Sequence, residues 1–166
     1  MISTLIYSSS SCLVGDAFQF DREMEKIRHV AAKHNEEHGI TGFLFYFDNR
    51  FVQILEGEFE AVTNLYSRIR HDERHKAVRI IWFSEIEGRD FSKWSMECSM
   101  NFIERNHSEL SVKLKFINRF ISDTSQQPIM LRDLLVSVAL EMQRRQDFPK
   151  PQLVPLAANR NTAQQK

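Results

Sequence analysis

Residues 40–58, ITGFLFYFDNRFVQILEGE, contain two apolar runs of strand length that meet at Asp48 and Asn49. Runs of this kind around an Asp-Asn pair are typical of a β-hairpin. Gln53 lies inside the second run, and its neighbours are apolar on both faces of the strand. The sequence therefore predicts that this amide is buried. Because an unpaired buried amide costs about 1–3 kcal/mol, Gln53 needs a polar partner in the interior, either a side chain or a bound ligand.

Length and composition indicate one domain with some additions, since 42% of the 166 residues are hydrophobic. The 22 basic and 22 acidic residues cancel, so we expect neither nucleic acid nor a membrane as a partner. Two cysteines, Cys12 and Cys98, are too few for a disulfide framework. No segment is typical of export or reaches the roughly 20 apolar residues that span a bilayer, so we expect a cytoplasmic protein.

The periodicity of apolar residues predicts the order β-α-β-β-α-β-β over residues 1–101. This is the order of an α+β, ferredoxin-like split βαβ sheet with one added strand. The first strand is expected over residues 2–7, with the four serines 8–11 in a loop, and the first helix over residues 21–38. Residues 94–101 alternate between apolar and polar side chains, which predicts a strand with one solvent-facing side that lies at a sheet edge or is partly exposed.

Two further helices are predicted near residues 108–122 and 129–145. The first two helices cover one face of the five-stranded sheet, and we expect the later two to cover the other. Side chains predicted to form that second face are Val52, Ile54, Leu44 and Tyr46. The predicted domains are 1–101, a helical extension over 102–147 packed on the sheet, and a Pro-containing, disordered tail over 148–166.

Six short motifs occur together in this order: LIYSS from residue 5, the pair His34 and Asn35 at a helix end, GITGFLFY from 39, RFVQILEG from 50, HDERH from 71 and KWSM from 93. As a set they resemble the BLUF family, blue-light sensors that use FAD. The resemblance covers residues 1–101. The C-terminal part is more loosely similar to the helical extension of short, stand-alone BLUF proteins.

The resemblance implies that the flavin ring lies between the first two helices, held between Ile27 and Ile69. It implies that Gln53 hydrogen-bonds both Tyr7 and the N5 and C4 carbonyl edge of the flavin. Asn35 pairs with the pyrimidine edge, and the adjacent His34 is a further cofactor contact.

Arg74 and His75 resemble the family positions that meet the C2 carbonyl and the ribityl or phosphate groups. An Arg there also favours negative charge on the reduced ring.

The resemblance also implies a photocycle that turns over no substrate, so the protein is not expected to be an enzyme. Excited flavin takes an electron and then a proton from Tyr7, the pair recombines, and Gln53 is left rotated or tautomerised. Absorption shifts to the red. Trp94 and Met96 exchange places near Gln53, and the signal passes to the C-terminal helices. The expected output is altered binding of an unidentified downstream protein or a changed homo-oligomeric state.

Each site residue also has a purely structural interpretation. Tyr7 alone is typical of a core aromatic residue, Gln53 of a satisfied core amide and Asn35 of a helix cap. Arg74 and His75 alone suggest a solvated turn, whereas Trp94 and Met96 suggest packing. The alternative function is a flavin-free protein-interaction module on the same scaffold, in which Tyr7 and Gln53 satisfy one another.

A metal site is a further alternative, because HDERH carries two histidines at i and i+4, and His34 and His38 repeat that spacing. A zincin helix needs Glu directly after the first His, but Asp72 stands there, and no third ligand is evident. We therefore predict no metal.

Overall fold

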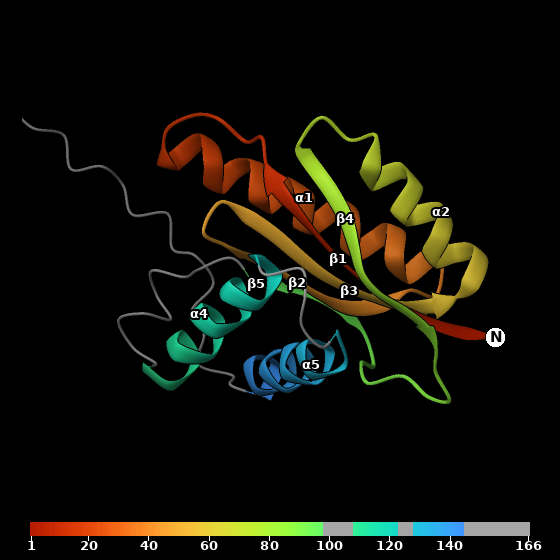
Figure 1. Cartoon of the computed structure of the whole chain (residues 1–166). Coiled ribbons are helices and arrows are strands. Elements are labelled where there is room, and N and C mark those ends of the chain that lie inside the picture. Colours follow the sequence, from red (N-terminus) through yellow and green to blue (C-terminus); the bar gives the residue numbers. More distant parts are fainter. Residues whose placement is uncertain (98–107, 123–127, 145–166) are drawn as a thin grey trace, which may run out of the picture.

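The computed structural model describes residues 1–97, 108–122 and 128–144 (Figure 1). Its elements are β1 (Ile2–Ser11), α1 (Ala17–Glu37), β2 (Thr41–Phe47), β3 (Arg50–Glu58), α2 (Phe59–Arg70), β4 (His75–Glu85), β5 (Trp94–Glu97), α4 (Ser108–Ser122) and α5 (Pro128–Arg144). This order confirms the predicted α+β, ferredoxin-like plan. The predicted tail over 148–166, residues 98–101 of the fifth strand and Cys98 lie outside the described residues.

The sheet has the order β4-β1-β3-β2-β5. Neighbouring strands are antiparallel except β2 and β5, which run parallel. β5 lies at an edge, as predicted. Helices α1 and α2 cover one face of the sheet, whereas α4 and α5 cover the other (Figure 1). No helix in the described ranges combines the length and the apolar character that crossing a bilayer would require.

The β2–β3 hairpin turns at Asp48 and Asn49, whose φ angles are 49° and 55°. Two positive φ angles are typical of the two-residue turns that match the twist of a hairpin. The turn sets the register so that Leu44 pairs with Gln53. Cross-strand partners point to the same face of a sheet, so Leu44 lies on the α1 and α2 side with Gln53.

The prediction that Leu44 and Tyr46 face the C-terminal helices is therefore wrong, because both belong to the cluster on the α1 and α2 side. Val52 and Ile54 do lie in the cluster beneath α4 and α5, as predicted.

Two elements extend beyond their predicted bounds. Ser8–Ser11 continue β1 instead of forming a loop, because β1 is an inner strand whose backbone bonds to β3 on one side and β4 on the other. α1 begins at Ala17, four residues before the predicted start, because Asp16 and Gln19 form a reciprocal capping box. The Asp16 carboxylate accepts from the Gln19 backbone N–H at 2.8 Å.

Candidate functional site

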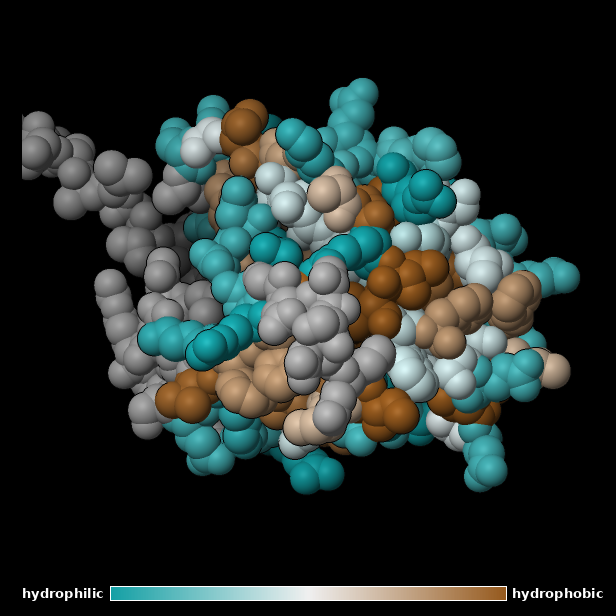
Figure 2. Space-filling view, viewed as in Figure 1, coloured by the Kyte–Doolittle hydropathy of each residue, from teal (hydrophilic) through white to brown (hydrophobic). Residues whose placement is uncertain are grey.

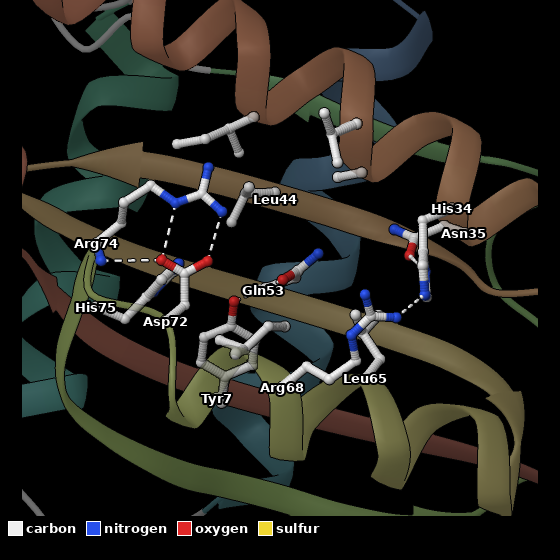
Figure 3. Close-up of a pocket in the computed structure, with 14 residues that line it drawn as sticks. Tyr7, His34, Asn35, Leu44, Gln53, Leu65, Arg68, Asp72, Arg74 and His75 are labelled. Carbon is white, nitrogen blue, oxygen red and sulfur yellow. Dashed lines mark hydrogen bonds and ion pairs between the residues drawn. The ribbon is translucent and has the colours of Figure 1, made fainter.

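A cavity of about 160 Å³ lies between α1, α2 and the sheet (Figure 3). Its walls contain all eight side chains that the sequence singled out as cofactor contacts: Tyr7, Ile27, His34, Asn35, Gln53, Ile69, Arg74 and His75. The other lining residues are Val30, Ala31, Leu44, Leu65, Arg68 and Asp72.

Tyr7 and Gln53 are cross-strand partners at the floor of this cavity. The Tyr7 hydroxyl donates to Gln53 Oε1 at 2.6 Å, and both residues are buried. Burial raises the pKa of Tyr7, and the nearby Asp72 charge raises it further, so the hydroxyl stays protonated and acts as the donor. The amide nitrogen of Gln53 points away from Tyr7 (Figure 3). The N–H groups of Gln53 Nε2 are therefore available to donate hydrogen bonds to a molecule in the cavity.

Asn35, near the end of α1, supplies a second buried amide. It is 1% exposed, and within the described residues its Nδ2 atom is buried without a hydrogen-bond partner. Its Oδ1 atom lies 3.4 Å from Nδ1 of His34. Because an unpaired buried donor is costly, the arrangement favours a ligand that brings acceptors to this amide.

Two charged contacts flank the amides, and both contain residues that the sequence did not single out. Arg74 donates from Nε and Nη2 to the two carboxylate oxygens of Asp72 at 2.8 and 2.5 Å (Figure 3). This pairing lowers the pKa of Asp72. Arg68 Nη1, on α2, lies 2.6 Å from His34 Nε2 on α1 and bridges the two helices.

His75, the first residue of β4, is a neutral side chain at the end of the cavity. Its Nδ1 atom lies 2.8 Å from Ser9 Oγ, and its ring centroid is 4.5 Å from that of Phe51. Burial lowers the pKa of His75 from 6.5 to about 4, and this outweighs the opposing effect of Asp72.

We expect the free energy of unfolding to fall as the pH drops from 6.5 to about 4, the interval between the two His75 pKa values. In that interval the unfolded chain binds a proton that folded His75 excludes, so acid favours unfolding. At about 1.4 kcal/mol per pKa unit, the loss reaches at most about 3 kcal/mol. Urea unfolding across this range, at one FAD concentration, should show a shallower pH dependence for His75→Asn. The exposed His29→Asn is the matched control, and equal slopes in all three proteins would contradict the assignment.

Trp94 and Met96 are both buried on the α1 and α2 side of β5, in the same cluster as Tyr7. Met96 is in register with Leu44, which is in turn in register with Gln53. Met96 thus lies in the same cross-strand row as Gln53, whereas Trp94 pairs with Gly42. Neither side chain is among the residues that line the cavity.

The paired histidines do not converge on a common centre. The rings of His34 and His38 stack with centroids 4.1 Å apart, and Nδ1 of His71 lies 2.7 Å from the Ser67 carbonyl oxygen. Within the described residues, no three His, Cys, Asp or Glu side chains gather in an arrangement that holds a metal ion.

The sequence of this chain matches a known protein family. The family described as "BLUF: Sensors of blue-light using FAD" matches residues 2–97. This chain belongs to the BLUF family. It is 37% identical over 75 residues to photoactivated adenylate cyclase subunit beta of Euglena gracilis, a match covering 45% of this chain and 9% of that protein. The match to subunit alpha is 42% over 67 residues, covering 40% of this chain and 7% of the relative. Both matches span less than a tenth of the relative.

Solved BLUF structures share the fold. The photo-activated state of BlsA is 25% identical with a TM-score of 0.62, and the match covers 84% of this chain and 96% of that one. The dark state of BlrB is 28% identical with a TM-score of 0.54, covering 67% of this chain and 82% of that one. A bacterial light-regulated adenylyl cyclase is 30% identical with a TM-score of 0.57, covering 74% of this chain and 36% of that one.

FAD is the cofactor of the BLUF family, and the cavity residues fit a flavin ring. The ring is flat, with apolar faces and carbonyl acceptors along one edge. Ile27 on α1 and Ile69 on α2 line the cavity and suit the faces, while the unpartnered Asn35 Nδ2 atom and the Gln53 nitrogen suit the carbonyl edge.

Proposed function

We propose that this BLUF protein signals by rearranging the Gln53 amide in light, which changes its binding to a partner protein or its own oligomeric state. The observation that carries the proposal is the buried Tyr7–Gln53 hydrogen bond. It lies in a cavity where Gln53 Nε2 and Asn35 Nδ2 can each donate a hydrogen bond to a ligand. The alternative, in which Tyr7 and Gln53 only satisfy one another, leaves the buried Asn35 Nδ2 atom unexplained.

The residues divide into those that hold the cofactor and those that respond to light. Ile27 and Ile69 clamp the ring, and Asn35 binds its pyrimidine edge next to His34. Arg74 and His75 contact the C2 carbonyl side and the groups beyond it. We add Arg68 and Asp72 to the binding residues, because both line the cavity and pair with His34 and Arg74.

Tyr7 and Gln53 carry the response. Bound FAD supplies the absorption of blue light and, when excited, a strong oxidising group. A phenol that loses an electron becomes strongly acidic, and Gln53 Oε1 lies 2.6 Å from the Tyr7 oxygen to receive its proton. Return of the electron and the proton leaves the Gln53 amide rotated or tautomerised, with changed donors and acceptors toward the cavity. No molecule is consumed or released in this cycle, so we expect no substrate turnover.

The structural output is proposed to begin at β5, where Trp94 and Met96 exchange positions relative to the Gln53 row. The unit that responds first is residues 1–101, and the extension over 102–147 passes the change to a partner or to a second copy of the chain.

Purified protein tests the proposal. We expect a yellow protein that releases FAD, not FMN, and whose flavin absorption moves to the red under blue light and returns in darkness. Size-exclusion chromatography and pull-downs in light and darkness then report the oligomeric state and the partner. A protein that stays colourless after reconstitution with FAD, or whose bound flavin shows no shift, would contradict the proposal.

A further inference from the structure

Glu56, on β3, is a fully buried carboxylate outside the flavin cavity, three residues beyond Gln53. Its two oxygens accept the backbone N–H groups of Asp90 at 3.2 Å and Phe91 at 3.1 Å. Burial raises the pKa of Glu56, opposed by these hydrogen bonds. Phe91 is 1% exposed and belongs to the cluster beneath α4 and α5. Glu56 therefore fixes the β4–β5 connection to the same strand that carries Gln53.

Arg89 holds the same connection in place through three more hydrogen bonds. Its Nη1 atom donates to the Glu56 carbonyl oxygen at 2.7 Å and to Thr41 Oγ1 at 2.8 Å. Its Nη2 atom donates to the Gly39 carbonyl oxygen at 2.8 Å. The connection is thus held to β3, to the start of β2 and to the segment just after α1.

Helix α5 has one polar contact with this connection and another with β5. Arg132 forms an ion pair with the Asp90 carboxylate. Gln143 donates from Nε2 to Ser95 Oγ in β5 at 2.6 Å. Positions 132 and 143 are eleven residues, or about three helical turns, apart, so they lie on one face of α5 about 16 Å from each other. α5 therefore lies along residues 90–95, with a polar contact at each end.

Helix α4 is held elsewhere. Asn118 donates from Nδ2 to Asp48 Oδ2 at 2.6 Å, which joins α4 to the turn of the β2–β3 hairpin. The polar contacts that tie α4 and α5 to the rest of the protein thus lie at different places, although Lys113 on α4 also pairs with Glu141 on α5 at 3.1 Å.

We propose that Glu56, Asp90 and Ser95 are positioning residues that couple the flavin site to α5. Of the two C-terminal helices, α5 is then the one that moves when β5 moves. Ser95 lies between Trp94 and Met96 on β5, and side chains alternate between the faces of a strand. Any displacement of β5 that moves Trp94 or Met96 on the flavin side also moves Ser95, and with it Gln143. This inference rests on the proposed light response of Gln53.

The test uses the full chain with bound FAD and two measurements on each protein, the light-minus-dark flavin spectrum and the light-minus-dark hydrogen exchange of amides in α5. The double variant Asp90→Asn/Ser95→Ala removes the ion pair and the Ser95 hydroxyl, while the Asp90 backbone N–H still reaches Glu56. We expect an unchanged spectral shift and a light-dependent exchange difference in α5 reduced at least about fivefold, the lower end of typical coupling between sites. Ser95→Thr, which keeps a hydroxyl, should keep most of the difference.

Asn118→Ala is the matched control, because it removes the polar contact of α4 with the hairpin turn and should leave the response of α5 intact. An unmodified chain without a spectral shift would overturn the proposed function and this inference with it. A normal shift with unchanged exchange in α5, or an undiminished α5 response in the double variant, would overturn this inference alone.

Discussion

Replacing Gln53 with Leu is expected to abolish the light-induced red shift while FAD remains bound. Leu has a similar size and fills the same position in β3, and the cavity keeps Ile27, Ile69 and Asn35 to hold the ring. It has no amide that can rotate or tautomerise, so the hydrogen bonds offered to the flavin cannot change in light. Light-minus-dark absorption spectra and the ratio of FAD to protein measure the two expectations.

The matched control is Gln143→Leu, the same change on α5 at the opposite face of the sheet, where Gln143 contacts Ser95. It should leave the spectral shift at its full size. A red shift that survives Gln53→Leu would remove Gln53 from its assigned role, whereas loss of the shift in both variants would indicate a general disturbance of the fold.

The sheet and its cavity follow from local patterns in the chain. The Asp48-Asn49 turn sets the hairpin, and the helical spacing of apolar residues brings α1 and α2 to the same face. Once β1 and β3 are neighbours, Tyr7 and Gln53 meet as cross-strand partners. The family motifs indicate six polar residues and two isoleucines as cavity residues, and the structure places all eight at the cavity.

The missed residues depend on side-chain contacts that the sequence pattern does not reveal. Arg68 on an amphipathic helix has the pattern of a solvent-facing residue, and its contact with His34 spans 34 positions. Asp72 entered the sequence analysis only as the residue that excludes a zincin helix, and its bonds to Arg74 have no signature in the sequence. The predicted face of Leu44 is wrong because β2 is apolar on both faces. Only the hairpin register decides its side, and alternation along a doubly buried strand does not reveal it.

The burial of Glu56 is even harder to predict from local sequence patterns. A Glu near the end of an apolar run suggests a strand terminus at the surface, since carboxylates are rarely fully buried. Its burial is stabilised by the backbone N–H groups of Asp90 and Phe91, about 35 residues later in the chain. No local pattern in the sequence contains that pairing.

Tyr7→Phe is the second substitution expected to abolish the light response. The variant should lose the photocycle but keep bound FAD. Phe keeps the ring that packs in the buried cluster, but it lacks the hydroxyl that donates to Gln53 Oε1. A phenyl ring is much harder to oxidise than a phenol and has no acidic proton to release. Steady illumination should therefore leave the absorption spectrum unshifted. Tyr46→Phe, on the same face of the sheet, is the matched control and should keep the shift.

The stabilities of these variants test the same hydrogen bond without light. Gln53→Leu leaves the fully buried Tyr7 hydroxyl without its acceptor, which should lower the free energy of unfolding by about 1–3 kcal/mol. Adding Tyr7→Phe removes the hydroxyl that was left without an acceptor. Replacing both partners by apolar groups changes the free energy of unfolding little. The double variant should therefore be more stable than Gln53→Leu alone in urea unfolding at matched FAD. Additive losses in the double variant would show that the two side chains do not act as a pair.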